Sequence, residues 1–193
     1  MTPELLPSPT RRADAERNRA KILAVARTAF AESDTEVSMA EISRRAGVGM
    51  ATLYRNFPDR RQLLEALYTH EVDAVCQAAD TVIGASPGTV LIAWLHRFFA
   101  FSTSKRLIAS ELLIHADNTN PVFGESRARV IAAGRPLLAA AQRAQEVRGD
   151  LTLEQILDMI VAIARIPGNP GYLEPILQSA LGGILLPIPV EPT

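Results

Sequence analysis

The stretch SMAEISRRAGVGMATLYRNF, residues 38–57, constrains the fold of this chain more than any other segment. Ser38 is followed three residues later by Glu41, which is the pattern of a capping box. In that motif the two side chains satisfy free backbone N–H groups at the start of a helix. Apolar residues then recur at helical spacing up to Ala46. The segment therefore predicts a helix that begins just after Ser38.

A glycine turn separates this helix from a second one. Gly47 ends the first helix, because the residue after a helix commonly takes a positive φ that glycine adopts without steric cost. The second helix is expected over about residues 50–56, with Leu53 and Phe57 facing inward. Helix, glycine turn and helix are the layout of a DNA-reading helix-turn-helix, whose second helix enters the major groove.

The match extends beyond this generic motif to a known family. Residues 13–70, about a third of the chain, resemble the TetR family of transcriptional regulators. In that family an apolar helix ends near a phenylalanine, and a capped helix, an Ala-Gly-Val turn and a Leu-Tyr-x-x-Phe-Pro run lead into a long fourth helix. The residues that carry the pattern here, in the same order and spacing, are Phe30, Ile42, Ala46, Gly47, Val48, Leu53, Tyr54, Phe57, Pro58 and Leu63.

Two segments depart from the family's pattern. Residues 32–36 stand where the family commonly has a glycine and an apolar residue, which predicts a slightly altered loop and the same fold. Residues 49–51, Gly-Met-Ala, stand where Ser or Thr and Gly are common. The second departure bears on which bases are contacted and not on the family.

Composition favours an all-α fold. Hydrophobic residues make up 48% of the 193 residues, enough for a sizeable core, while aromatic residues make up only 5%. Ala and Leu are the common apolar residues and both are strong helix formers. No alternating β-branched run predicts strands. We expect about nine helices, forming a three-helix DNA-binding head and a C-terminal helical domain.

The resemblance and the chain's Pro and Gly breakers divide it into four parts. These are a flexible basic arm at 1–12, a helix-turn-helix domain at 13–58, a helical ligand-binding and dimerisation domain at 59–186, and an extended tail at 187–193. A kink is expected at Pro136, which removes a backbone donor. The other expected helices lie at about 13–31, 60–83, 89–102, 107–116, 121–146, 153–166 and 172–181.

The distribution of charge, the single cysteine and the length of the apolar runs indicate what class of protein this is. Residues 1–61 hold 11 Lys and Arg against 8 Asp and Glu, whereas the remainder holds 9 against 13. A basic head on an acidic body suits a head that faces phosphates. Cys76 is the only cysteine, so it cannot form an intrachain disulfide. We expect its side chain to be buried and to pack as a small hydrophobic group. No apolar run reaches the ~20 residues that span a bilayer, and a cytoplasmic protein without a membrane partner is expected.

The outward face of the helix at 50–56 is the expected base-reading surface, because the major groove admits one α-helix. Met50 and Ala51 can touch thymine methyl groups, and Thr52 and Arg55 can reach either bases or the DNA backbone. The alternative is an ordinary solvated helix face. The surrounding pattern favours DNA contact.

Phosphate contacts are expected around this helix. By resemblance, Tyr54 and the position of Asn56 contact phosphates, and Arg60 stands where the family commonly has a lysine that meets the DNA backbone. Ser38 caps its helix in any case, and a helix N-terminus also suits a phosphate. The basic pair in the N-terminal arm can reach a minor groove or a phosphate, or can be a solvated tail. The full set of expected DNA contacts is Arg11, Arg12, Ser38, Met39, Arg44, Gly49, Met50, Ala51, Thr52, Tyr54, Arg55, Asn56 and Arg60.

The body resembles the family's ligand-binding and dimerisation domain only in general form. A small-molecule pocket in a helical bundle is mostly apolar with few polar anchors, although aromatic residues at helical spacing are usually core. The pocket candidates are Trp94, Phe98, Phe99, Phe101, His115, Met159 and Tyr172. The three histidines, at 70, 96 and 115, do not have metal-ligand spacing, so no metal or cofactor is expected.

The helix at 153–166 is apolar on nearly every side, so more than one side must be buried. The resemblance implies a homodimer with a four-helix interface made from the last two helices of each subunit. Two heads about one helical turn apart, ~34 Å, would read a palindromic operator in double-stranded DNA. The expected interface residues are Ile156, Ile160, Ile163, Leu173, Ile176, Leu177, Ala180 and Leu181.

Together these features predict a homodimeric transcriptional regulator that responds to a small-molecule effector, and a repressor is expected. In this hypothesis the effector favours a conformation in which the two heads are wrongly spaced. One alternative is a TetR-like helical protein that has lost DNA binding and acts as an interaction module. A small helical enzyme is the least favoured alternative, because the sequence offers no nucleophile–base pair, carboxylate pair, phosphate loop or metal cluster. The operator, the effector and the choice between repressor and activator stay open at this point.

Overall fold

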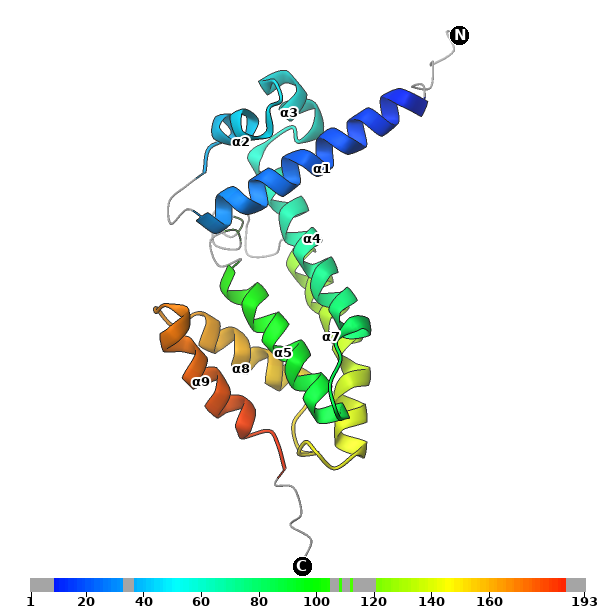
Figure 1. Ribbon diagram of the computed structural model, residues 1–193, viewed down its shortest axis with the longest axis vertical. Coiled ribbons are helices and arrows are strands. Elements are labelled where there is room, and N and C mark those ends of the chain that lie inside the picture. The colour runs from blue at the N-terminus through cyan, green and yellow to red at the C-terminus, as the bar shows by residue number, and fades with distance from the viewer. Residues whose placement is uncertain (1–8, 33–36, 105–107, 109–111, 113–120, 187–193) are drawn as a thin grey trace, which may run out of the picture. The chain divides into compact units, whose positions relative to one another are not determined.

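The computed structural model describes residues 9–32, 37–104, 108, 112 and 121–186. These residues form eight α-helices and contain no strand, only an isolated bridge between Val147 and Leu185 (Figure 1). The all-α prediction is confirmed. The helices are α1 (Pro9–Glu32), α2 (Met39–Ala46), α3 (Met50–Asn56), α4 (Arg60–Thr81), α5 (Pro87–Ser104), α7 (Pro121–Arg143), α8 (Leu153–Ala164) and α9 (Pro170–Gly182).

Most predicted helices lie close to their observed bounds. Residues 50–56 match α3 at both ends, and α2 begins directly after its Ser38 cap. The first helix begins at Pro9 rather than near residue 13, so it includes part of the segment expected to be a flexible arm. Proline is common at the first position of a helix, because the missing N–H would have no partner there. Of the helix expected at 107–116, only residues 108 and 112 are described, and the tail at 187–193 lies outside the described residues.

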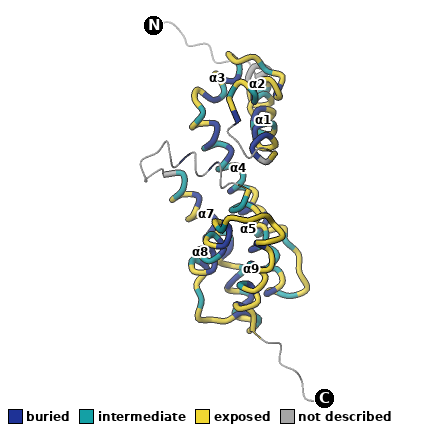
Figure 2. The backbone as a smooth tube through the Cα atoms, turned by 90° about the vertical axis from the view of Figure 1, so that its left-hand side faces the viewer, coloured by how far each residue is buried: buried dark blue, intermediate teal, exposed yellow. Residues whose placement is uncertain are grey.

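The chain divides into two compact units, a head unit ending at Tyr68 and a body unit beginning at Thr69. The helix α4 contributes residues to both. Within each unit, buried positions gather on the sides where helices face one another (Figure 2).

The head core forms because α1 packs on both α2 and α3. Apolar residues at helical spacing on α1 meet those of the two short helices and the start of α4. The buried side chains are Ile22, Ala26, Ala29, Phe30, Val37, Ile42, Ala46, Leu53, Phe57, Leu63, Leu64 and Leu67. Asp59 caps α4, because its Oδ1 accepts a hydrogen bond of 2.7 Å from the backbone N–H of Gln62.

The body core is built around Trp94 on α5. The Trp94 side chain is fully buried and its indole N–H donates to the carbonyl of Val75 on α4, 3.0 Å away. The helix α5 packs against α7 and α8, and α8 packs against α9. The half-buried Cys76 is less enclosed than expected, and burial still raises the pKa of its thiol.

Gly134 on α7 gives the Trp94 ring its space. A Cβ at Gly134 would lie 2.2 Å from the Trp94 ring, which is far inside van der Waals contact. Two residues later, Pro136, where a kink was expected, lies inside α7 without ending it. Pro136 and Ala132 are both exposed, so water can reach the carbonyl that loses its helical partner.

Replacing Gly134 with alanine is expected to destabilise the protein by about 1–3 kcal/mol, the usual range for an overpacked core. In a free helix the same change would stabilise by roughly 1 kcal/mol, so the sign of the effect reports the contact with Trp94. The matched control is Gly124→Ala on the same helix, where a Cβ would meet nothing within 4 Å. Urea unfolding of both variants provides the measurement, and equal shifts in the two would contradict the packing described.

A carboxylate from the segment after α7 caps α5. The Glu146 Oε2 atom accepts hydrogen bonds from the Ser86 hydroxyl at 2.7 Å and from the backbone N–H of Gly88 at 2.5 Å. An anion is favourable at this end of a helix because free N–H groups point toward it. The same segment pairs with the residues after α9, where the Leu186 N–H donates to the Glu146 carbonyl at 2.9 Å.

Candidate nucleic-acid interface

The turn between α2 and α3 is fixed by a specific backbone arrangement. Gly47 has φ 60°, and its N–H donates to the carbonyl of Arg44 at 3.1 Å. The N–H of Val48 donates to the carbonyl of Ser43 at 3.2 Å, which completes a Schellman motif. The buried Ser43 hydroxyl donates to the carbonyl of Val48 at 2.6 Å. Because these bonds lock the turn, α3 leaves α2 at a defined angle.

The exposed face of α3 is centred on Ala51 and Arg55. Leu53 is buried on the opposite side, since residues two apart in a helix point in nearly opposite directions. Tyr54 is 45% exposed and Met50 is 39% exposed. These four outward positions are the ones expected to meet bases or phosphates, so the structure brings the predicted reading residues together on one face.

Thr52 and Asn56 are half-buried at the edge of this face. The side-chain amide of Asn56 donates to the carbonyl of Thr52 at 2.8 Å. The Thr52 hydroxyl accepts a hydrogen bond of 3.1 Å from Arg55 Nη2. Both residues therefore have roles within α3, and a phosphate contact from Asn56 would have to use its remaining amide donor.

Arg19 on α1 supports the end of α3, a role that the sequence did not reveal. Its Nη1 donates to the carbonyl of Asn56 at 2.9 Å, and its guanidinium lies 4.3 Å from the centroid of the Phe57 ring. A cation is favourable at a helix C-terminus because the last carbonyls carry partial negative charge, and the ring adds a cation–π contact. Nothing in local spacing links residues 37 positions apart in the chain.

The expected capping box at α2 is half confirmed. The Ser38 hydroxyl accepts a hydrogen bond of 3.1 Å from the Glu41 N–H, as predicted. The Glu41 carboxylate is instead engaged by Arg44 at 2.6 and 3.0 Å and by Arg45 at 2.6 Å. These hydrogen bonds, that of Arg45 first, hold the pKa of the Glu41 carboxyl below its usual range. Arg45 also contacts Glu32 at 2.8 Å.

Arg44 is an expected DNA contact whose charge is already paired in the free head. Its side chain is 73% exposed, and exposed ion pairs of this kind contribute little to stability. Arg44 can therefore exchange the Glu41 carboxylate for a phosphate at small cost. Met39 at the start of α2 is half-buried, while Gly49 forms the exposed N-cap of α3 without a side-chain hydrogen bond.

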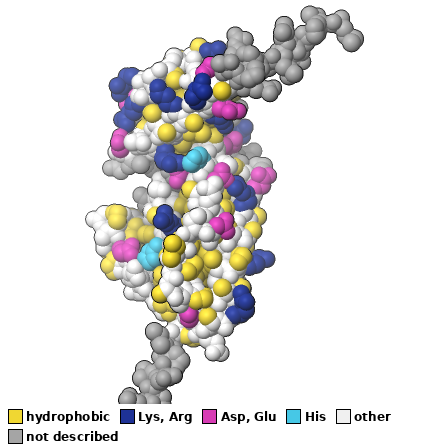
Figure 3. Space-filling model, turned by 45° about the vertical axis from the view of Figure 1, so that its right-hand side comes forward, with side chains coloured by type: hydrophobic (Ala, Val, Ile, Leu, Met, Phe, Trp, Pro, Cys, Tyr) yellow, Lys and Arg dark blue, Asp and Glu magenta, His cyan; other side chains and the backbone are white. Residues whose placement is uncertain are grey.

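Arg60 has a role inside the head that its expected phosphate contact did not include. Its Nη1 donates to the carbonyl of Val37, and its guanidinium lies 5.5 Å from the centroid of the Phe30 ring. These contacts tie α4 to the residues just before α2. Arg11 and Arg12 lie in the first turns of α1 rather than in an arm that precedes it. In Figure 3 several Lys and Arg side chains, interspersed with Asp and Glu, lie on the visible face of the head unit among hydrophobic and other side chains.

The predicted ligand-pocket residues have different environments. Phe98 and Phe99 are buried with Trp94, and the Trp94 and Phe98 rings stack with centroids 6.3 Å apart. Phe101 and Met159 are half-buried. Tyr172 is 58% exposed, which does not suit an enclosed pocket, and His115 lies outside the described residues.

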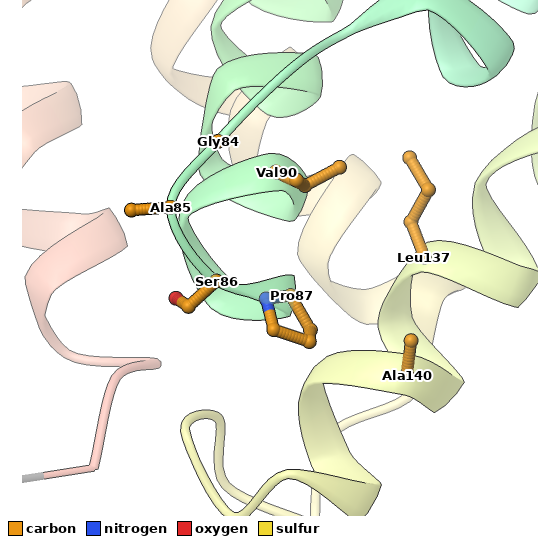
Figure 4. Close-up of a pocket in the computed structure, with 7 residues that line it drawn as sticks. All are labelled: Gly84, Ala85, Ser86, Pro87, Val90, Leu137 and Ala140. Carbon is orange, nitrogen blue, oxygen red and sulfur yellow. The ribbon is translucent and has the colours of Figure 1, made fainter.

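An open depression of about 400 Å³ lies elsewhere in the body unit, and none of the predicted pocket residues lines it. Its wall comes from the turn before α5, from the first turns of α5 and from α7 (Figure 4). The lining residues are Gly84, Ala85, Ser86, Pro87, Val90, Leu137 and Ala140. It offers few polar groups to orient a ligand.

The predicted dimer residues are mostly turned into the protomer. Ile176 and Ala180 are half-buried. The other six, which are buried within the body unit and do not form an open face, are Ile156, Ile160, Ile163, Leu173, Leu177 and Leu181. The sequence of an all-apolar helix does not show which side faces the core of its own protomer. The sequence alone therefore could not separate core residues from interface residues.

Two kinds of site can be assessed over the part of the chain that the structure describes. Among those residues, no group of His, Cys, Asp and Glu side chains is arranged to hold a metal ion. No described helix is both long and apolar enough to cross a membrane.

Two family models match this chain. Residues 22–67 match the model described as bacterial regulatory proteins of the tetR family. Residues 86–184 match the model described as the C-terminal domain of SbtR-like transcriptional regulators. Both matches are with regulators of transcription and not with enzymes.

Individual proteins give the same result. A solved TetR transcriptional regulator from Streptomyces coelicolor is 32% identical with a TM-score of 0.70, over 86% of this chain and 98% of that chain. A solved structure of RolR in complex with the ligand resorcinol is 25% identical with a TM-score of 0.56, over 90% of each chain. An HTH-type transcriptional regulator from Staphylococcus aureus (strain USA300) is 38% identical over 63 residues, 32% of this chain and 34% of that protein. The match thus spans about a third of the length of that curated relative.

Proposed function

The chain belongs to the TetR family of transcriptional regulators, with a DNA-binding N-terminal domain, and we propose that it is a repressor that binds a palindromic operator as a homodimer. A small-molecule effector bound in the body unit would release the operator. The observation that carries the proposal is the exposed face of α3, held by the Gly47 turn and presenting Met50, Ala51, Tyr54 and Arg55. The compartment we propose is the cytoplasm, where a bacterial regulator meets its DNA.

The dimer would form through the flank of α8 and α9 that carries no charge. On one flank of α8, Asp158 pairs with Arg127 at 2.8 Å and Glu154 pairs with Arg135 at 3.2 Å, so α7 neutralises that flank. The other flank of α8 carries residues at spacings of four and three that are uncharged and at least partly exposed. They are Gln155, Met159 and Ala162.

The outward face of α9 has the same character. Its buried residues are leucines at every fourth position, Leu173, Leu177 and Leu181. The side of α9 away from them carries no charge. The residues of that side are Tyr172, Pro175, Ile176, Ser179 and Gly183. Small and apolar side chains let two helix pairs approach closely, and an interface core is depleted of charge. This open α8–α9 face replaces the buried residues as our proposed dimer surface.

The effector site would use the half-buried apolar residues of the body unit. RolR, a relative of the same fold, was solved with resorcinol. In this chain Phe101 retains exposed surface that a ligand could cover, whereas Trp94 already has a hydrogen-bond partner in Val75. The effector can shift the protein between its two states only by its differential affinity for them. Since α4 contributes residues to both units, it is the element through which such a shift would pass.

Selection of the full-length protein on random duplex DNA tests the proposal. The expected result is enrichment of a palindrome, bound by two protomers with an affinity that falls steeply as salt rises. If no sequence is enriched, the DNA-binding proposal fails and an interaction module becomes the better reading. Adding candidate small aromatic compounds to the complex then tests for release.

Arg44→Ala is expected to weaken binding about equally for all sequences. It should reduce the slope of log affinity against log salt by about one per protomer, because one phosphate contact is lost from each. The matched control is Arg97→Ala, which removes the same charge from the exposed side of α5 in the body unit. Titration by fluorescence anisotropy at several salt concentrations gives the slopes. An unchanged slope for Arg44→Ala would remove this residue from the phosphate contacts.

A further inference from the structure

The chemistry of α3 indicates which base its operator contains. Its exposed face offers two apolar side chains, Met50 and Ala51, one phenol at Tyr54 and one guanidinium at Arg55. Of these, only the guanidinium presents several hydrogen-bond donors in a fixed fork. That fork matches guanine, whose O6 and N7 accept a bidentate pair in the major groove. Apolar groups at the other positions suit thymine methyl groups.

Arg55 is already held where a base reader must be. Its Nε donates to the carbonyl of Ala51 at 3.2 Å and its Nη2 donates to the Thr52 hydroxyl at 3.1 Å. Helical side chains lean toward the N-terminus, so the guanidinium of a residue near the end of α3 lies over its first turn. Base edges are contacted from that end of a recognition helix. The short side chain of Ala51 leaves the position open.

Arg55 also differs from Arg44 and Arg45 in the groups that its N–H donors bind. Of five N–H donors, two make the bonds to Ala51 and Thr52, which leaves both donors of Nη1 and one of Nη2. Two of these, one from each nitrogen, suffice for the guanine fork. Arg44 and Arg45 are bound to the Glu41 carboxylate, whereas Arg55 pairs with no carboxylate among the described residues. Its partners are neutral atoms of its own helix, so it is orientated before binding at little electrostatic cost.

From this geometry we infer that Arg55 reads a guanine in each half-site of the operator and is the main determinant of sequence specificity on α3. The inference rests on the proposed function, because it needs α3 in the major groove. The inference also predicts how far apart the two contacted base pairs lie. Ala51 and Arg55 are about 6 Å apart along the helix, so the guanine should lie within about two base pairs, at ~3.4 Å each, of a thymine contacted through its methyl group.

The test compares selections on random duplex DNA by the wild-type protein, Arg55→Ala and the charge-matched control Arg61→Ala. Arg61 is exposed on α4 and its nearest acidic partner, Glu65, is 3.8 Å away. Wild type and Arg61→Ala are expected to enrich the same guanine, while Arg55→Ala should accept any base there and keep its other preferences. Affinity for the wild-type site should fall about 10- to 100-fold in Arg55→Ala. Alanine suits a helix, and thermal unfolding checks that the head remains folded.

A modified base tests whether Arg55 contacts the N7 atom of the guanine. Replacing the selected guanine with 7-deazaguanine removes the N7 acceptor, so wild-type binding should weaken while binding by Arg55→Ala should not change. If Arg55→Ala selects the wild-type motif with uniformly lower affinity, Arg55 contacts a phosphate and the inference is wrong. If the wild-type protein enriches no sequence at all, the proposed function itself fails, and this outcome is distinct from a motif that ignores Arg55.

Discussion

Ala162→Asp on α8 and Ser179→Asp on α9 are each expected to convert the proposed dimer into monomers. Both positions lie on the open α8–α9 face and are exposed in the protomer. A charge there would be desolvated between two subunits and would lie near its own copy across the twofold axis. Such a juxtaposition costs several kcal/mol, so dimerisation should weaken by at least about a hundredfold. Sedimentation velocity at several protein concentrations measures the change.

DNA binding should fall together with the dimer. Two linked heads gain affinity through the effective concentration of the second head, and this gain is commonly about 10²- to 10⁴-fold. Ala74→Asp on α4 is the control, because it adds the same charge to an exposed helix position outside the face. If the α8 and α9 variants stay dimeric, the uncharged flank is not the interface. If they become monomers but keep full operator affinity, the palindromic reading is wrong.

Trp94→Ala is expected to destabilise the protein by about 3–5 kcal/mol, the usual cost of deleting a large buried aromatic side chain. The side chain is fully buried, and its removal also leaves the Val75 carbonyl without the indole donor. Since domains are commonly stable by only about 5–15 kcal/mol, the variant should lose about a third or more of a typical domain's stability and unfold at a clearly lower urea concentration. Urea unfolding followed by circular dichroism measures the loss.

Phe101→Ala on the same helix is the comparison for Trp94. Phe101 is only half-buried, so its truncation should cost less than half as much. In the wild-type protein the single tryptophan should also show blue-shifted emission that acrylamide quenches poorly. A stable Trp94→Ala variant with altered effector response would instead assign this residue to the ligand pocket, as the sequence pattern also allowed.

The sequence by itself determined the local structure of the head. The bounds of α2 and α3, the Ser38 cap, the Gly47 turn and the Asp59 cap all follow from interactions between residues no more than five apart. The same holds in the body for the capping box of α8, where Thr152 and Gln155 bond one another's backbone N–H groups. Such motifs are readable because their partners are near in the chain, whatever the rest of the molecule does.

Tertiary structure decided which partner each side chain takes when several are within reach. Arg60 reaches the carbonyl of Val37, and Arg19 supports the end of α3. These contacts join residues more than twenty positions apart, a separation over which spacing carries no signal.

The faces of α8 and α9 also show what the sequence determines and what only the folded structure decides. Their apolar character was clear from the sequence, yet most of the leucines and isoleucines expected to meet a partner fill the protomer's own core. Burial in a protomer and burial in a dimer require the same residue types, so composition cannot distinguish them. Only the folded body unit, with α7 neutralising one flank of α8, leaves a particular uncharged face open.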